Sequence, residues 1–258
     1  MTRSHGYSPA QYVALGSSFA AGLGLGPRAA GSPFFCMRSI NGYPQQLARM
    51  AGLSLVDASC SGATTRHVLH GGQFFQPAQL DALDSTTELV TLTAGGNDVG
   101  YIRDLVFLAK RRKPGLAAAL LRTVWSGPKP AELRNFAGLR DNFDAIFAEI
   151  ARRAPIARVF AVTYPAILPP EGTCPNLGMT EQEAEIMRQV ADRLAEVTCD
   201  AANAAKAATI DMAKLSAGHH ACSAMPWVFG DEPKSPAFHP TLSGAEATAR
   251  KILGAIRP

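Results

Sequence analysis

The 258-residue sequence contains no uninterrupted apolar run long enough to cross a bilayer. Its first residues also lack the charged-then-apolar pattern of a secretory signal. These absences favour a cytoplasmic location for the chain as written, whereas an N-terminus trimmed at a signal-cleavage site would belong to a secreted protein. No repeat or linker divides the sequence, so we expect one α/β domain over residues 1–258.

Strong charge is also missing. The formal net charge is only +4, and no basic stripe is interleaved with aromatic residues, which argues against a nucleic-acid partner. The short run Lys110-Arg111-Arg112-Lys113 favours a solvated helix end over a patch that binds phosphate or membrane. Hydrophobic content of 47% is ordinary for a globular protein.

Metal-binding patterns are scarce as well. The five cysteines form no CxxC pair, which argues against a zinc ribbon or a redox motif. His219 and His220 lie in a loop without further placed ligands, so we expect no metal and no cofactor. Five reduced thiols would suit a cytosolic protein.

What the sequence does contain begins with the stretch from Gln11 to Gly26, QYVALGSSFAAGLGLG. The apolar run Tyr12–Leu15 meets Gly16, which indicates a buried strand entering a tight turn. Ser18 then lies at the carboxyl end of the first strand, the place where open α/β sheets bind their ligands.

Four later apolar runs indicate further strands, over residues 53–58, 88–94, 158–163 and 209–212. Helical spacing covers residues 43–50 and 180–208, and the second helix begins with a capping box, Thr180 followed by Glu183. Residues 101–150 form a helical region broken near Pro114 and Pro128. This alternation predicts one parallel sheet with helices on both faces.

Four short blocks lie in order along these elements. They are the turn around Ser18, the turn Ser59–Thr65 centred on Gly62, the turn Gly95-Gly96-Asn97-Asp98, and His239-Pro240 before the last helix. In this order they resemble the blocks of the SGNH (GDSL-type) hydrolase family. The resemblance implies a three-layer αβα domain with a flavodoxin-like five-stranded parallel sheet of order 2-1-3-4-5.

The resemblance also implies roles for individual residues. Ser18 would be the nucleophile and His239 the base, while an oxyanion hole would use the N–H groups of Ser18 and Gly62 and the side-chain amide of Asn97. Two family aspartates are absent, because Ser17 and Pro236 occupy their positions. A serine–histidine dyad follows, in which the backbone carbonyl of Pro236 orients the imidazole.

Asp231 and Glu232 are nearby alternatives to that carbonyl. The spacings of four cysteines resemble two disulfides of secreted family members, Cys36–Cys60 and Cys174–Cys222, which would leave Cys199 unpaired. The alternative of five reduced thiols stays open.

The function implied is hydrolysis of a small-molecule acyl ester through an acyl-serine intermediate, without a cofactor. Family members with the same residues also transfer acyl chains to a sugar hydroxyl, so an acyltransferase is the alternative. The simplest interpretation of the helical region 101–150 is a set of helices that face the core. A second hypothesis makes the segment from Pro114 to Pro130 a mobile cover over the site.

Two other classes of protein compete. Gly22, Gly24 and Gly26 after the first strand, with Asp57 ending the second, superficially fit a dinucleotide-binding unit, but the Gly-x-Gly-x-x-Gly spacing is absent. An inactive binding module is the other competitor, because both family aspartates are missing. The Gly-x-Ser-x-Gly elbow of α/β-hydrolases is also absent.

Overall fold

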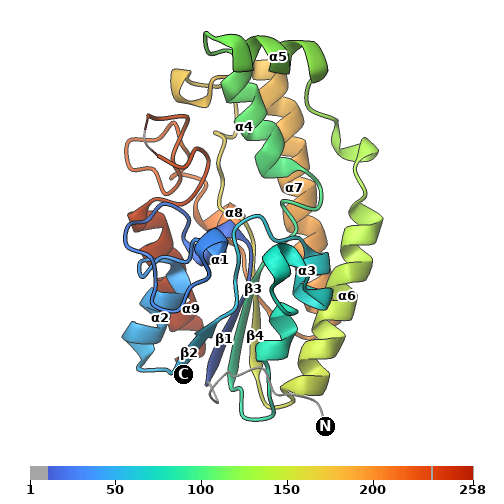
Figure 1. Cartoon of the computed structure of the whole chain (residues 1–258), viewed down its shortest axis with the longest axis vertical. Coiled ribbons are helices and arrows are strands. Elements are labelled where there is room, and N and C mark those ends of the chain that lie inside the picture. Colours follow the sequence, from blue (N-terminus) through green and yellow to red (C-terminus); the bar gives the residue numbers. More distant parts are fainter. Residues whose placement is uncertain (1–10, 234, 258) are drawn as a thin grey trace.

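The structure is a computed structural model that describes residues 11–233 and 235–257. The first ten residues, where the sequence shows no signal pattern, lie outside this description. Within it, five parallel strands form one sheet of order β2-β1-β3-β4-β5 (Figure 1). The strands are β1 (Tyr12–Gly16), β2 (Leu55–Asp57), β3 (Leu89–Thr93), β4 (Arg158–Val162) and β5 (Ala208–Ile210). The predicted fold class and strand order are confirmed.

Helices cover both faces of this sheet, as Figure 1 shows. One face carries α2 (Tyr43–Ala51) and α9 (Leu242–Ile256), which pack against each other. The other carries α3 (Thr65–His70), α6 (Phe136–Arg153) and α7 (Glu181–Ala204). The remaining helices are α1 (Ser18–Ala21), α4 (Tyr101–Arg111), α5 (Leu116–Val124) and α8 (Met212–Leu215).

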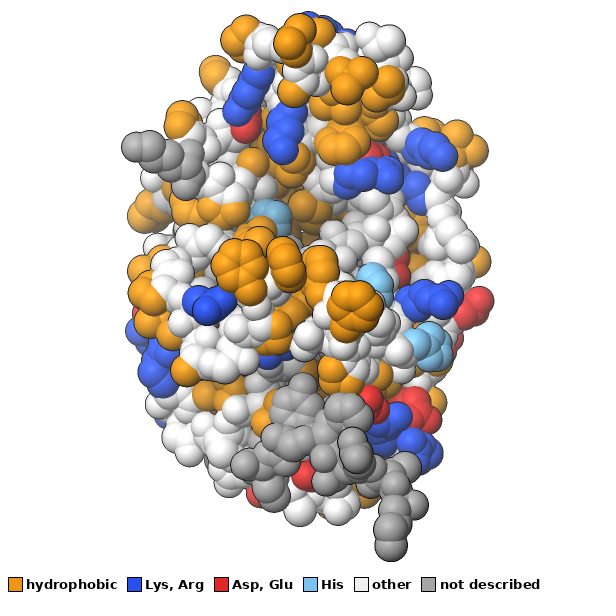
Figure 2. All heavy atoms as spheres, viewed as in Figure 1, with side chains coloured by type: hydrophobic (Ala, Val, Ile, Leu, Met, Phe, Trp, Pro, Cys, Tyr) orange, Lys and Arg blue, Asp and Glu red, His pale blue; other side chains and the backbone are white. Residues whose placement is uncertain are grey.

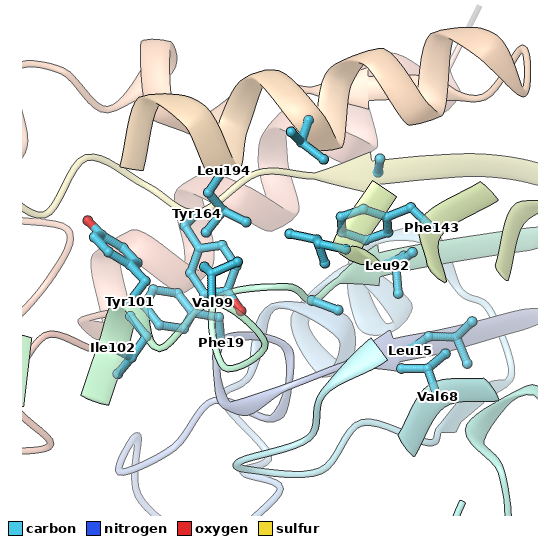
Figure 3. Packing of buried hydrophobic residues seen from close by; sticks show 14 of the residues in the cluster. Leu15, Phe19, Val68, Leu92, Val99, Tyr101, Ile102, Phe143, Tyr164 and Leu194 are labelled. Carbon is cyan, nitrogen blue, oxygen red and sulfur yellow. The ribbon is translucent and has the colours of Figure 1, made fainter. Parts of the chain in front are cut away.

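Alternation of side chains along the strands produces two cores, one on each face. In β1, Val13 and Leu15 point into the cluster beneath α6 and α7, whereas Tyr12 and Ala14 point into the cluster beneath α2 and α9. Figure 3 shows part of the first cluster, with Leu15 near Val68 of α3. Since both faces of β1 are buried, the strand is a continuous apolar run in the sequence.

The structure differs from the predicted elements at several ends. Strand β2 is shorter than residues 53–58, and α7 ends at Ala204, because Lys206 adopts a positive φ of 56° that turns the chain toward β5. Helix α3 was not predicted. Its capping box pairs Thr64 with His67 instead of Glu or Gln, so the usual sequence signature is missing.

The helical region 101–150 contains α4, α5 and the start of α6. Helix α5 lies beyond the end of α4, far from α1 in Figure 1, and packs on α4. Among its residues only Ala118 is buried. This segment, for which core-facing helices and a mobile cover were the two interpretations, therefore turns most of its apolar side chains to solvent.

Two disulfides cross-link the fold, Cys36–Cys60 and Cys174–Cys222, and Cys199 is a free thiol. The pairing implied by the family resemblance is confirmed. Over the described residues, none of the helices has the combination of length and apolar character that a membrane crossing demands.

Candidate active site

Backbone hydrogen bonds draw the ends of β1, β2 and β3 together. The N–H of Ser17 donates to Thr93 O at 2.9 Å, and the N–H of Cys60 donates to Gly16 O at 3.0 Å. The turns that follow these strands carry Ser18, Gly62 and Asn97. The parallel sheet therefore gathers three segments, far apart in sequence, at one edge.

The turn before Ser18 requires glycine. Gly16 has φ +135°, and a Cβ at this position would lie 2.2 Å from Thr93 O. Gln79, which follows the loop after α3, forms two hydrogen bonds with the backbone of Gly16. Its Oε1 accepts the Gly16 N–H at 2.7 Å, and its Nε2 donates to Gly16 O at 3.0 Å. No sequence motif pointed to Gln79.

Ser18 and His239 meet although 221 positions separate them. The Oγ of Ser18 lies 2.8 Å from Nε2 of His239, and both side chains are buried. The loop before α9 is held by two bonds with Phe229, whose N–H donates to His239 O at 2.8 Å and whose carbonyl accepts the Phe238 N–H at 3.1 Å. These bonds place the imidazole over the Ser18 turn.

The other ring nitrogen corrects one prediction. Nδ1 of His239 lies 2.9 Å from Ala237 O, not from Pro236 O. The Pro236 carbonyl accepts the backbone N–H of His239 at 3.1 Å instead. It closes a tight turn in which Phe238 has φ +62°, so it points away from the ring. Asp231, one alternative, pairs with Lys113 Nζ at 2.8 Å.

This arrangement selects one tautomer. A carbonyl oxygen can only accept, so Nδ1 carries the proton and Nε2 is free to accept from the Ser18 hydroxyl. Burial lowers the pKa of His239, and the bond to Ala237 O raises it only in part. The imidazole is consequently a neutral base at pH 7, which is the form that nucleophile activation needs.

The turns around Ser18 hold hydrogen-bond donors that the fold does not use. Asn97 Nδ2 donates to Ala63 O at 2.8 Å, which joins the third block to the turn of Gly62. An amide nitrogen has two hydrogens, so one donor of Asn97 remains. Among the described residues, no acceptor takes the backbone N–H of Ser18 or of Gly62. Three unused donors thus accompany the serine.

A buried tyrosine holds the Ser18 turn in place. Tyr164, which follows β4, places its hydroxyl 2.9 Å from Ser17 Oγ and accepts the Gly96 N–H at 3.2 Å. Its ring packs 4.5 Å from that of Phe19, as Figure 3 shows. Burial raises the pKa of Tyr164 to about 12, so the phenol stays protonated. Ser17 thereby anchors the turn through a neutral hydrogen bond.

The third block is fixed by its last residue. Asp98 accepts from both the N–H and the hydroxyl of Thr65, and Asn142 Nδ2 donates to the Thr65 oxygen at 2.9 Å. Burial raises the pKa of Asp98, while the bonds from Thr65 oppose that effect. The network ties the Asn97 turn to α3 and α6. The sequence placed Asp98 in the block without indicating these partners.

The glycine-rich segment after α1 is a packed turn. Gly22 ends α1 in the left-handed region with φ 71°, and a Cβ on Gly24 would lie 2.4 Å from the ring of Pro236. These contacts account for the glycines by close approach within the chain. They give no support to the dinucleotide-binding alternative.

A cavity of about 270 Å³ lies against Tyr164. Tyr101, Ile167 and Leu194 form part of its wall, and Asp192 also faces it. Neither Ser18 nor His239 lines this space.

The model of the GDSL-like Lipase/Acylhydrolase family matches residues 14–247. The chain belongs to this family. The match runs from β1 into α9, and it includes all four turns that meet at the site. In this GDSL hydrolase, the serine–histidine contact therefore lies within the matched region.

Comparisons with individual proteins agree with the family. A lipase of Streptomyces rimosus is 31% identical over 237 residues, which cover 90% of this chain and 81% of that protein. The crystal structure of phospholipase A1 from Streptomyces albidoflavus NA297 has a TM-score of 0.74 at 28% identity and covers 97% of this chain and 100% of that one. These relatives support a hydrolase of the lipase and esterase kind.

The extracellular lipase of S. rimosus is similar at a TM-score of 0.72 and 29% identity, covering 95% of this chain and 97% of that one. An acetyl-xylooligosaccharide esterase mutant from a Geobacillus has a TM-score of 0.55 at 16% identity and covers 96% of this chain and 94% of that one. At that identity the likeness extends to the fold alone.

Proposed function

We propose that this GDSL hydrolase cleaves carboxylic esters through a covalent acyl-Ser18 intermediate. The observation that carries the proposal is the 2.8 Å contact between Ser18 Oγ and His239 Nε2, with Nδ1 committed to Ala237 O. A serine hydroxyl attacks a carbonyl only when a base accepts its proton, and this contact supplies that base.

In the first half-reaction, Ser18 Oγ attacks the carbonyl carbon while its proton moves to His239 Nε2. The negative charge that develops on the carbonyl oxygen is stabilised by the N–H groups of Ser18 and Gly62 and the amide of Asn97. Collapse of the tetrahedral intermediate breaks the ester C–O bond. His239 returns its proton to the departing alcohol, and Ser18 is left acylated.

In the second half-reaction, water attacks the acyl-enzyme, gives a proton to His239 and releases the carboxylic acid together with the restored Ser18 hydroxyl. The imidazolium that forms in each half is stabilised by the carbonyl dipole of Ala237 instead of a carboxylate. This dyad replaces the aspartate that the family places at the position of Pro236.

Lipid acyl esters are the substrate class that the relatives support, because their printed names are lipase and phospholipase A1. The two disulfides favour an oxidising compartment over the cytoplasm, and one similar structure is of an extracellular lipase. We therefore infer that the protein works outside the cytoplasm, on lipid esters.

The test compares Ser18→Ala and His239→Ala with the control His219→Ala, a histidine whose ring stacks on Trp227 and whose Nδ1 lies 2.8 Å from Met225 O. With a p-nitrophenyl ester, each of the first two variants should lose at least about a thousandfold in kcat, while the control keeps its activity. A fluorophosphonate should label the native protein but not Ser18→Ala. Turnover by Ser18→Ala near the native rate, or absence of labelling, would exclude the acyl-serine route and favour an inactive binding module.

Adding sugar acceptors to the same assay addresses the acyltransferase alternative. If water is the acceptor, the free acid remains the product at every sugar concentration. An acylated sugar in the products would assign the transferase activity instead.

A further inference from the structure

Four phenylalanines stand on the surface beside the candidate site. Phe34 and Phe35 belong to one short turn and Phe74 and Phe75 to another, and all four are exposed, Phe34 by 70%. Phe35 stacks on Phe74 with ring centroids 5.0 Å apart, and it meets the edge of Phe34 at 5.3 Å. We call these four residues the aromatic ridge. Exposed aromatic side chains grouped in this way mark interaction surfaces.

The backbone holds the ridge outward. Phe74 and Phe75 have φ values of 48° and 60°, a region that bulky residues rarely occupy. The disulfide Cys36–Cys60 links the turn of Phe34 and Phe35 to the segment before Gly62. The turn of Phe74 and Phe75 is linked to the same segment, because Gln73 Nε2 donates to Ser61 O at 2.8 Å. The rings are thus presented by a fixed scaffold.

The same contacts place the ridge beside the turn of Gly62. A Cβ on Gly62 would lie 3.4 Å from Gln73 Nε2, and Phe74 follows Gln73 directly. Any surface that covers Phe74 and Phe75 therefore lies close to the turn that carries an oxyanion donor.

Helix α5 supplies a second apolar feature. Leu116, Leu120 and Val124 recur every four residues on one side of this helix, and all are exposed, Leu116 by 90%. We call them the α5 stripe. Apolar positions at this spacing normally face a protein core. In Figure 2, hydrophobic side chains gather both at the top, over α4 and α5, and across the middle of the same face.

Basic residues outnumber acidic ones in the two segments that carry the ridge and the stripe. The first 80 residues hold five arginines and a single acid, Asp57, which is buried, so they account for the whole net charge of +4. Arg28 lies over the ring of Phe34, 5.6 Å from its centroid. Residues 105–131 add six basic residues and no acid, although Arg111 and Arg112 pair with Glu183 and Lys113 pairs with Asp231. Figure 2 shows Lys and Arg side chains between the two hydrophobic groups.

We propose that the aromatic ridge and the α5 stripe together dock the protein on an anionic lipid surface. Aromatic and aliphatic side chains enter the interface of a bilayer, and neighbouring lysines and arginines are attracted to anionic headgroups. The use of this docking to bring lipid esters to Ser18 rests on the proposed function, whereas the docking itself does not.

A second copy of the chain fits this face less well. A two-fold interface places each patch against its own copy, so the arginines and lysines around the ridge and the stripe would face one another. Among the described residues, Arg28, Lys110 and Arg122 form no ion pair that would offset this repulsion. An anionic surface complements them.

The test measures co-sedimentation with vesicles of phosphatidylcholine alone and of phosphatidylcholine with phosphatidylglycerol in equal parts. The native protein should bind the anionic vesicles, and more weakly in high salt. Phe75→Ala and, independently, Leu120→Ser should each reduce the affinity about tenfold. Turnover of a soluble ester should stay unchanged in both variants.

Ile156→Ala is the matched control, because Ile156 is 62% exposed but lies between α6 and β4; it should bind as the native protein does. Ser18→Ala should also bind normally, so failure of the proposed chemistry and failure of docking are distinguishable. Absence of binding to anionic vesicles would overturn the proposal. So would concentration-dependent dimerisation, without lipid, that Phe75→Ala abolishes, because the face would then be a self-interface.

Discussion

Replacing Tyr164 by phenylalanine tests whether its hydroxyl holds the Ser18 turn in place. The ring and its packing against Phe19 remain, so the change removes only the oxygen. That oxygen is the partner of Ser17 Oγ at 2.9 Å and of the Gly96 N–H at 3.2 Å. Ser17 and Gly96 are both buried, so water cannot replace the lost bonds without opening the turn.

The magnitude follows from these two groups. A buried donor or acceptor left without a partner costs about 1–3 kcal/mol, so Tyr164→Phe should lower the free energy of unfolding by about 2–4 kcal/mol. Tyr101→Phe is the matched control. Tyr101 is equally buried, but its hydroxyl makes no hydrogen bond with the described residues and it lines the cavity. Loss of the Tyr101 hydroxyl should lower the free energy of unfolding by about 0.5 kcal/mol or less.

Urea unfolding of both variants measures the difference, with equal m-values showing that the same surface is exposed. Because Ser17 directly precedes Ser18, Tyr164→Phe should also lower kcat for a soluble ester and leave KM unchanged. In a double-mutant cycle, Tyr164→Phe should lower the free energy of unfolding much less when Ser17 is already alanine than in the native chain. If the two tyrosine variants unfold within about 0.5 kcal/mol of each other, the brace is refuted.

Three further outcomes follow from the site and its supports. Burial lowers the pKa of His239, so activity should persist below pH 6.5 and fall only when pH drops through the folded-state pKa. The free energy of unfolding should be unaffected by His239 above the pKa of this residue in the unfolded chain. It should decline as pH falls from there to the pKa of His239 in the folded protein, because the unfolded chain binds the proton more readily. A pH series of unfolding measurements on the native protein and on His239→Gln, which should lack this decline, measures the effect. Replacing Cys174 and Cys222 by serine should cost about 4 kcal/mol, since the bridge spans 48 residues, and an unchanged thermal midpoint would contradict that. Gln79→Leu, of similar volume, should lower the free energy of unfolding measured in urea by about 2–4 kcal/mol and reduce kcat, because the N–H and the carbonyl of Gly16 both lose their partner. A variant as stable as the native chain would show that Gln79 does not hold this turn.

Local signals in the sequence were sufficient for most of the fold. Apolar runs predicted the five strands, and β1 and β3, whose runs meet a glycine, lie where expected within one residue. The capping box at Thr180 predicted the start of α7. Helix α3 was missed, because its cap uses His67, a residue type that carries no capping signal.

For the site, the order of the blocks selected Ser18, Gly62, Asn97 and His239, and the structure brings their turns together. The partner of the imidazole was predicted wrongly. Which carbonyl faces Nδ1 depends on the backbone at Phe238, whose φ of 62° turns Pro236 O into the loop and Ala237 O toward the ring. A backbone dihedral angle of that kind has no signature in residue types.

By itself, the sequence of this GDSL hydrolase determined its strands, the family to which its blocks belong and the glycines that permit tight turns, because each depends on neighbours a few residues away. Only the tertiary structure decided that Tyr164 and Gln79 hold the turn before Ser18, from 147 and 63 positions away, and that the phenylalanines face outward. Such contacts arise when the sheet gathers distant loops at one edge, and residue types alone do not state which loops will meet.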